Sequence, residues 1–291
     1  MKALRCALEN TESQHGEDLL LLPTLLLAAG GRPGSFVELG ALNGVRYSNT
    51  VVLERCFGWR GVLIEGNPDN FDQLQRSSRA AVKVNSAVCR GEGTVAFTAG
   101  GSQEAGDLSV LRAADLHSVA FNKPNHSAAV NVSCRPLSRI VDEAGFRDSI
   151  DFLSLDVQGA ELKVLQASRP AQFGLIMSEY YGFGGVDERR RKSIAKLVEG
   201  AGLRPMRSHG KTQEQFYVFG SDIYFRRGLQ PVRVWPEERK RLRESNVQFF
   251  HCKARLRGAK GRVQRDDPAF ALWGDDVGWK PGGASPIHKS G

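Results

Sequence analysis

The chain has 291 residues, of which 41% are apolar and 25% are charged, the proportions of an ordinary globular protein. This composition excludes a collagen-like, a wholly disordered and a polytopic membrane protein. The formal net charge of +8 comes from the last part of the sequence, because residues 1–225 contain 25 basic and 25 acidic side chains whereas residues 226–291 contain 15 and 7. The sequence therefore predicts a neutral body followed by a basic C-terminal extension.

The longest apolar run, residues 19–29, lies near the N-terminus and contains 11 residues. A bilayer-spanning helix needs about 20 apolar residues, so no transmembrane segment is expected. The acidic pair Glu17-Asp18 precedes the run, whereas a signal peptide carries positive charge at that place. We expect residues 1–34 to form an N-terminal helical segment that packs on the body.

Five cysteines are present, an odd number, and no two of them lie within four residues of each other. This spacing excludes a Cys-X-X-Cys metal or redox motif and argues against a disulfide framework. We therefore expect no metal site, a reducing compartment and a cytoplasmic location. Asn125 and Asn131 each begin an Asn-X-Ser pattern, which matches the acceptor of N-glycosylation but is short enough to arise by chance.

From residue 35 onward, short apolar runs alternate with helical patterns. The strands expected first are residues 35–40, 61–65 and 80–84, and the helices between them are residues 45–57 and 69–76. Pro68 stands at the start of the second helix, where its missing N–H is not needed. This strand–helix–strand–helix–strand order favours a parallel sheet with helices on both faces.

The order continues more loosely through the second half of the body, where residues 94–98 and 129–133 could form a strand pair around a polar loop. The later expected elements are strands at 151–156 and 173–177, helices at 136–144, 159–167 and 187–201, and closing strands at 216–219 and 223–225. The prediction is an α/β fold, a doubly wound and mostly parallel sheet in one domain over residues 35–225. The basic segment, residues 226–291, is expected to be poorly structured.

Two acidic side chains end successive predicted strands, Glu38 in Glu38-Leu-Gly-Ala-Leu-Asn-Gly44 and Glu65 one strand later. Open parallel sheets bind ligands at the carboxyl ends of their strands. Gly40 permits a sharp turn there, and Gly44 permits close approach of a ligand. The spacing of the glycines differs from that of the phosphate-binding motifs. An acidic loop suits S-adenosylmethionine, which carries an ammonium and a sulfonium but no phosphate, and Glu65 could accept both hydroxyls of its ribose.

Longer stretches of the sequence resemble one family. They are Ser13-Gln14 with Gly16-Glu17-Asp18, Phe36 to Gly44, Tyr47-Ser-Asn-Thr50, Gly58 to Pro68, and Asp151 to Leu162 with its Asp156-Val-Gln-Gly-Ala-Glu161. The chain is similar to the FkbM family of S-adenosylmethionine-dependent methyltransferases over roughly residues 13–225. The glycine–acid motif is generic to class I methyltransferases, whereas the Ser-Asn-Thr and Asp-Val-Gln-Gly-Ala-Glu strings are distinctive. The basic segment lies outside the resemblance.

The resemblance implies a binding site for S-adenosylmethionine at the carboxyl ends of the strands. Glu65 would hold the ribose hydroxyls. Asp156 would face the methyl donor, where it could position the acceptor or the methionine ammonium. The other implied cofactor residues lie along the methionine and ribose side (Glu38, Gly40 and Gly44), beside the ribose (Asn67) and near the adenine (Asn85 and Ser86).

Two positions depart from the family: Asn43 stands where members commonly have Asp, and Gln158 where they often have Glu. The loss of two acids could alter substrate or metal use. A hydroxyl acceptor also needs a base within reach to take its proton. The candidate catalytic residues are Asp156, Glu179 at the end of a later strand, and His209 on a loop, while Glu161 could equally line the site, face solvent or cap its helix.

Three functions stay open. The leading hypothesis is O-methylation of a hydroxyl on a small molecule or a glycan. The second is a nucleic-acid or protein methyltransferase whose basic segment docks the substrate, since arms rich in Lys and Arg attract phosphate backbones. The third is a non-catalytic module that binds the cofactor. The methyl acceptor and the oligomeric state have no readable signal in the sequence.

Overall fold

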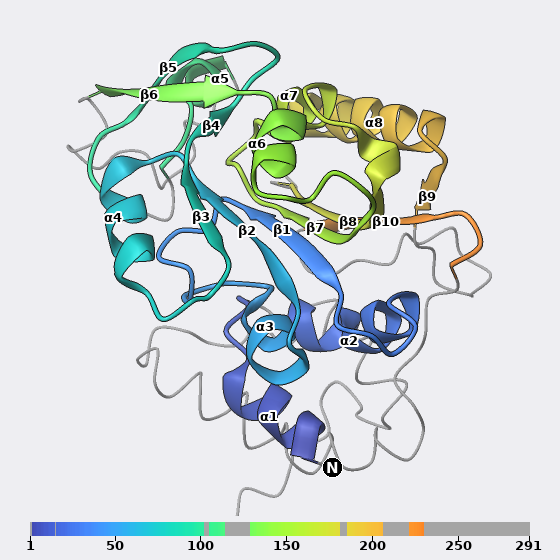
Figure 1. The fold of residues 1–291 in the computed structure, drawn as a ribbon. Coiled ribbons are helices and arrows are strands. Elements are labelled where there is room, and N and C mark those ends of the chain that lie inside the picture. Colours follow the sequence, from blue (N-terminus) through green and yellow to red (C-terminus); the bar gives the residue numbers. More distant parts are fainter. Residues whose placement is uncertain are drawn as a thin grey trace, which may run out of the picture.

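The computed structural model of the chain describes residues 2–14, 16–101, 105–113, 129–180, 185–205 and 221–229. Its centre is a seven-stranded sheet of order β3-β2-β1-β7-β8-β10-β9 (Figure 1). The strands are β1 (Ser35–Leu39), β2 (Arg60–Glu65), β3 (Val82–Asn85), β7 (Ile150–Leu155), β8 (Phe173–Glu179), β9 (Leu203–Pro205) and β10 (Ser221–Arg226). Neighbours from β3 to β8 are parallel, and β10 is antiparallel to β8 and β9. The predicted mostly parallel α/β sheet is confirmed.

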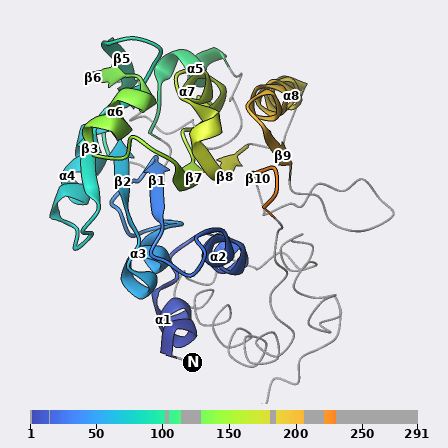
Figure 2. The same cartoon turned by 45° about the vertical axis from the view of Figure 1, so that its right-hand side comes forward.

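Helices cover both faces of the sheet, as Figures 1 and 2 show from two directions. The first face packs against α1 (Lys2–Asn10), α2 (Glu17–Ala28), α3 (Val51–Phe57) and α4 (Pro68–Arg76), and the second against α6 (Leu137–Glu143), α7 (Glu161–Gln166) and α8 (Gly185–Gly200). Alternation along β1 explains the division, because successive side chains of a strand point to opposite faces. Phe36 belongs to the first apolar layer, and Val37 and Leu39 belong to the second.

A smaller sheet stands over the carboxyl ends of the parallel strands (Figure 1). It contains β4 (Ala87–Val88), β5 (Gly93–Thr98) and β6 (Ala129–Arg135) in the order β4-β6-β5, with β5 antiparallel to β6. The predicted strand pair is therefore confirmed. A short helix, α5 (Leu108–Ala113), and a 3-10 turn, Pro170–Gln172, complete the described elements.

One predicted helix is shorter than its pattern indicates. α3 begins at Val51, whereas the apolar spacing predicted a start at residue 45. Tyr47 has a φ of 62°, which no right-handed helix contains. Residues 48–50 instead direct hydrogen-bond donors at the side chain of Glu38. Hydrogen bonding to the buried carboxylate of Glu38 therefore holds residues 48–50 in a non-helical conformation.

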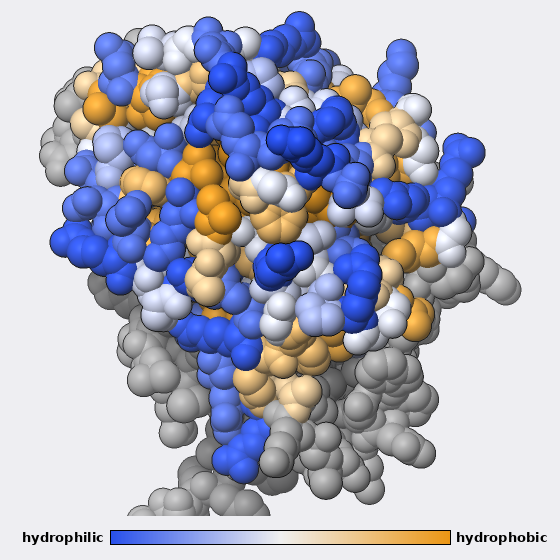
Figure 3. All heavy atoms as spheres, viewed as in Figure 1, coloured by the Kyte–Doolittle hydropathy of each residue, from blue (hydrophilic) through white to orange (hydrophobic). Residues whose placement is uncertain are grey.

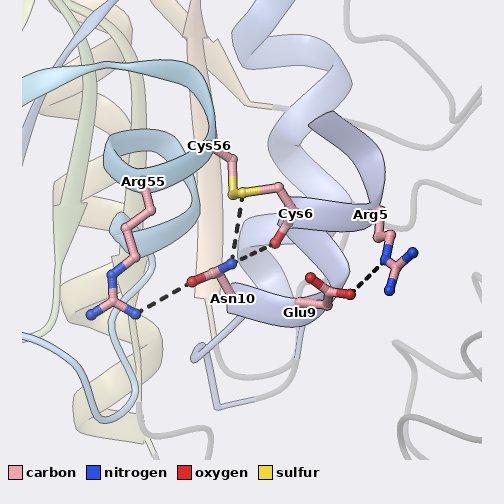
Figure 4. Close-up of a disulfide and its surroundings, with 6 residues drawn as sticks. All are labelled: Arg5, Cys6, Glu9, Asn10, Arg55 and Cys56. Atoms are coloured by element: carbon pink, nitrogen blue, oxygen red, sulfur yellow. Dashed lines mark hydrogen bonds and ion pairs between the residues drawn. A yellow bond between two sulfur atoms is a disulfide. The ribbon is translucent and has the colours of Figure 1, made fainter. Parts of the chain in front are cut away.

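The prediction that the cysteines form no disulfide is wrong. Cys6 in α1 is bonded to Cys56 in α3 (Figure 4), and Cys89 is bonded to Cys134 in β6. The partners are 50 and 45 residues apart in sequence, with Cα–Cα distances of 5.7 and 5.6 Å, so the pairing depends on the tertiary fold and leaves no mark in local spacing. The fifth cysteine, Cys252, lies outside the described residues. The expected cytoplasmic location rested on the absence of disulfides, and the two disulfides remove that support.

Among the described helices, none has the length and apolar character needed to cross a membrane. On the face shown in Figure 3, hydrophobic residues form separate small groups among hydrophilic ones. Of the residues described, Leu27 and Val82 are the exposed large apolar side chains. The predicted strand 216–219 and residues 230–291 of the basic segment lie outside the described part of the chain.

We expect a double variant, Cys6→Ala with Cys56→Ala, to lose about 2–4 kcal/mol of unfolding free energy, because the bond restricts the unfolded chain. Urea unfolding without reductant measures the loss. Either single variant should lose nearly as much as the double variant, since each removes the same bond. Unfolding midpoints equal to that of the unmodified protein would contradict the prediction.

Candidate functional site

A pocket opens at the carboxyl ends of β1, β2 and β7. The chain winds from β1 toward β3 on one side and from β7 toward β8 on the other, and open α/β sheets bind ligands where the strand order reverses in this way. The walls are formed by residues 38–42, 46–49, 64–66, 86–88, 105–107 and 156–158, together with Asn70, Val95, Phe97, Ser154, Ala160 and Val164. The small sheet therefore provides part of the wall above the strand ends.

Three residues other than glycine have left-handed backbones in the part of the chain that is described, and all three line this pocket. They are Leu42, Tyr47 and Gln158, with φ values of 50°, 62° and 55°. Such conformations are uncommon outside glycine and persist where surrounding contacts hold them, which happens most often at functional sites. The backbone thus marks the pocket independently of its side chains.

The carboxylate of Glu38, at the end of β1, accepts three hydrogen bonds from the loop before α3. One oxygen accepts hydrogen bonds from Ser48 Oγ and Thr50 Oγ1, each at 2.7 Å, and the other accepts one from the backbone N–H of Asn49 at 2.7 Å. Glu38 is 4% exposed. Although Glu38 lines the pocket, its main task is to hold residues 48–50 in place.

A buried arginine balances this carboxylate. The guanidinium of Arg79 lies 3.8 Å from Glu38 and 3.2 Å from Glu54, and it donates to the carbonyl oxygen of Gly44 and to Thr50 Oγ1. The side chain of Arg79 has no exposed surface. Buried charges are tolerated when they are paired and hydrogen-bonded, and this ion pair joins β1, α3 and the segment before β3.

Asn49, like Ser48 of the same loop, lines the pocket. Its Nδ2 donates to Ser154 Oγ in β7 at 3.1 Å, and both residues line the pocket. Its Oδ1 is buried and has no hydrogen-bond partner among the described residues. A buried acceptor without a donor is costly.

Glu65 ends β2 beside Glu38. Its two oxygens accept backbone hydrogen bonds from Leu42 and Asn67, each at 2.8 Å, and the carboxyl also forms a hydrogen bond with the side chain of Asn70. Burial raises the pKa of Glu65 from 4.5 to about 7, against the opposing effect of these hydrogen bonds, and the neighbouring Asp156 raises it further. The carboxyl is therefore in place to receive ribose hydroxyls.

The two predicted glycines have different surroundings. Gly40 lines the pocket with a φ of +83°, and a Cβ there would lie 1.8 Å from the carbonyl oxygen of Asp156. Glycine is therefore needed for the ends of β1 and β7 to meet. Gly44 is not in the pocket wall, and a Cβ there would lie 2.5 Å from the side chain of Leu74 in α4, so this glycine serves helix packing.

Of the three remaining predicted cofactor residues, only Ser86 lines the pocket. Asn67 is fully buried and caps α4, and its Nδ2 donates to the carbonyl oxygen of Thr98 at 2.8 Å. The Nδ2 of Asn85 donates to the carbonyl oxygen of Glu65 at 2.9 Å. Asn67 and Asn85 therefore support the pocket wall from behind.

Two carboxyl groups meet at the ends of β7 and β8. Asp156 lines the pocket and accepts a hydrogen bond from Gln158 Nε2 at 3.0 Å. Burial raises the pKa of the Glu179 carboxyl well above its ordinary value, and the charge of Asp156 and a hydrogen bond to it raise the pKa further. Glu179 Oε2 is buried without a hydrogen-bond partner in the described part of the chain. Burial and the neighbouring carboxyl therefore favour the protonated form of Glu179.

Glu161 is buried, and one of its oxygens accepts from the backbone N–H of Gly159 at 2.9 Å and of Val157 at 3.3 Å. It caps the turn into α7, and burial raises its pKa to about 7. Within the described ranges, no group of three or more His, Cys, Asp or Glu side chains is arranged to hold a metal ion. His209, the third catalytic candidate, lies outside the described residues.

The described wall of the pocket contains four acidic side chains, Glu38, Glu65, Asp107 and Asp156, and one basic side chain, Arg46. Such a wall favours a cationic ligand. Comparison with protein families agrees, since the family described as "Methyltransferase FkbM domain" matches residues 38–188. The chain belongs to the FkbM methyltransferase family. It is accordingly an S-adenosylmethionine-dependent methyltransferase, and the match begins at Glu38 and includes every acid of the pocket.

Solved structures also resemble this FkbM chain. Methyltransferase FkbM from Methylobacillus flagellatus KT is 14% identical over 77% of this chain and 58% of its own, with a TM-score of 0.39. The O-methyltransferase from Bacillus cereus in complex with SAH is 12% identical over 77% of this chain and 87% of its own, with a TM-score of 0.35. A comparison with curated proteins gave no match.

Sequence reasoning missed several residues of the FkbM pocket. Asn49 belongs to the distinctive Ser-Asn-Thr string, to which no role was assigned, and Ser154 lies within the β7 string. A polar residue in an otherwise apolar strand is a usable signal for Ser154. Val95 and Phe97 carry no signal, because only the tertiary position of β5 brings them to the pocket.

We expect Arg79→Met to lose about 3–5 kcal/mol of unfolding free energy, because it leaves Glu38 and Glu54 buried without their partner. The matched control is Arg76→Met in α4, whose ion pair with Asp72 is 72% and 71% exposed and which should change stability by less than about 0.5 kcal/mol. Urea unfolding compares the two. Equal losses would show that the Arg79 pairs do not stabilise the fold.

Proposed function

We propose that this methyltransferase transfers the methyl group of S-adenosylmethionine to a hydroxyl group of a small molecule or a glycan. The observation that supports a hydroxyl acceptor most directly is the carboxyl pair of Asp156 and Glu179 beside the pocket. A hydroxyl must lose its proton as the new carbon–oxygen bond forms, so a base within reach is required. Asp156 lines the pocket and has the chemistry for that task.

The pocket residues fit the cofactor along its length. Glu65 accepts the ribose hydroxyls, and the wall formed by Asn49 and Ser154 receives the methionine end of the cofactor. Ser86 and the apolar side chains of Val95 and Phe97 form the end of the pocket that suits the adenine. When bound, S-adenosylmethionine supplies an electrophilic methyl group on a sulfonium. Holding acceptor and donor in line supplies much of the rate enhancement in such a displacement.

The two carboxyl groups, Glu179 and Asp156, have different roles in proton transfer. Glu179, with its raised pKa, keeps a proton and donates a hydrogen bond to Asp156. Asp156 accepts the hydroxyl proton of the substrate while the acceptor oxygen attacks the methyl carbon. Gln158, also hydrogen-bonded to Asp156, fixes the orientation of that carboxylate. His209 remains a further candidate for the base.

We expect Glu65→Gln to raise the Kd for S-adenosylmethionine about 10- to 100-fold, the effect of losing hydrogen bonds to a charged group. The affinity of the unmodified protein should fall as the pH is lowered below about 7, because Glu65 then takes up a proton. Titration calorimetry at several pH values measures both effects. Asp69→Asn, an exposed carboxyl of α4, is the control and should match the unmodified protein. Parallel pH profiles for Glu65→Gln and the unmodified protein would contradict the role of Glu65.

We expect Asp156→Asn to lower the rate of methyl transfer about 10²- to 10⁴-fold, the usual contribution of a positioned base. The measurement follows labelled methyl groups from S-adenosylmethionine into acceptors of a cell extract and identifies the product by mass spectrometry. Asp151→Asn, at the opposite end of β7, is the control and should keep the activity. A labelled nitrogen, nucleic acid or protein in place of an O-methyl product would overturn the proposed acceptor.

A further inference from the structure

Both disulfides join parts of the chain that fold together only in the native structure. Cys6–Cys56 ties α1 to α3, and Cys89–Cys134 ties the end of β4 to β6 in the small sheet. Disulfides of this kind form and persist in oxidising compartments and are rare where glutathione keeps thiols reduced. The structure therefore points to maturation in an oxidising compartment, which in eukaryotic cells is also where asparagine side chains are glycosylated.

Asn131 lies three residues before Cys134 on β6 and begins the sequence Asn131-Val-Ser133. Residues two apart on a strand point to the same face, and the side chains of Asn131 and Ser133 are both exposed. The residue opposite Asn131 on β5 is Ala96, also exposed. Its single methyl group leaves room above the sheet for a bulky substituent. The amide of Asn131 and the hydroxyl of Ser133 therefore lie side by side on the exposed face of β6.

The other face of the small sheet has a different task. Val95 and Phe97 of β5 line the pocket, and Val132 and Cys134 of β6 are buried in the same small apolar layer. A group attached to Asn131 would therefore point away from the pocket wall. Modification there is compatible with a working methyltransferase.

We propose that Asn131 carries an N-linked glycan in the mature protein. The amide nitrogen of Asn131 forms a bond to the anomeric carbon of an oligosaccharide and loses one proton. The leaving group is the pyrophosphate of the lipid-linked oligosaccharide that serves as donor. The glycan shields the exposed face of the small sheet and leaves the pocket side unchanged. This inference does not depend on the identity of the methyl acceptor.

The test is peptide mapping, without reduction, of the full chain made in eukaryotic cells and passed through their secretory pathway. We expect the cross-linked peptides Cys6–Cys56 and Cys89–Cys134. We also expect a peptide in which glycosidase release in heavy-oxygen water converts Asn131 to labelled aspartate. Ser133→Ala should abolish the label, and Ser133→Thr, which keeps the hydroxyl, should retain it. Asn125→Gln removes the second Asn-X-Ser pattern and should leave the label at Asn131 unchanged.

Two results would overturn the inference. One is an unmodified Asn131 peptide from protein whose cysteines are disulfide-bonded as described. The other is free thiols at all four cysteines of the secreted protein, which would remove the argument for an oxidising compartment. Neither result bears on methyl transfer, which is measured separately by product identification.

Discussion

The carboxylate of Glu38 is buried at the end of β1, and every part of the pocket near it depends on how its charge is satisfied. Ser48, Asn49 and Thr50 must turn toward it, and Arg79 must lie beneath it. A buried charge left without partners is strongly destabilising. These contacts hold the loop before α3 in the conformation that brings Asn49 to the pocket wall.

The small sheet is held in place by contacts of a different kind. Gly66 follows β2, and a Cβ at that position would lie 2.7 Å from the ring of Phe97, so the absence of a side chain lets β5 approach the strand ends. Asn67 then ties the start of α4 to the end of β5 through Thr98. The Cys89–Cys134 bond joins the end of β4 to β6 in the same sheet. Together these contacts fix the upper wall of the pocket relative to the parallel strands.

Much of the fold could be predicted because its signals are local. Apolar runs such as Phe36 to Leu39 predict buried strands, and Pro68 after Asn67 marks the start of α4. The acids at strand ends could be predicted for the same reason, and Glu38, Glu65 and Asp156 do line the pocket.

The failures have a common physical cause, which is that the deciding partner is distant in sequence. The start of α3 depends on Glu38, and the disulfides depend on the packing of α1 and of the small sheet. Tertiary contacts of this kind override local pattern. Asn67 and Asn85 also depend on tertiary contacts. Each is a sequence neighbour of a residue that lines the pocket, but its amide donates a hydrogen bond to a backbone carbonyl of the surrounding structure.

The direction of β10 has a consequence for the basic segment. Because β10 runs antiparallel to β8, Phe225 pairs with Leu175 near the start of β8, whereas Ser221 pairs with Glu179 at its end. The chain enters this strand at the edge of the sheet where the pocket opens and leaves it at the opposite edge. Over the five steps from Ser221 to Arg226, at about 3.3 Å per residue, the separation is roughly 17 Å. A basic segment that begins at Arg226 therefore starts at the end of the strands opposite the pocket. For any part of it to contact a methyl acceptor in the pocket, the chain would have to span the length of the strands again.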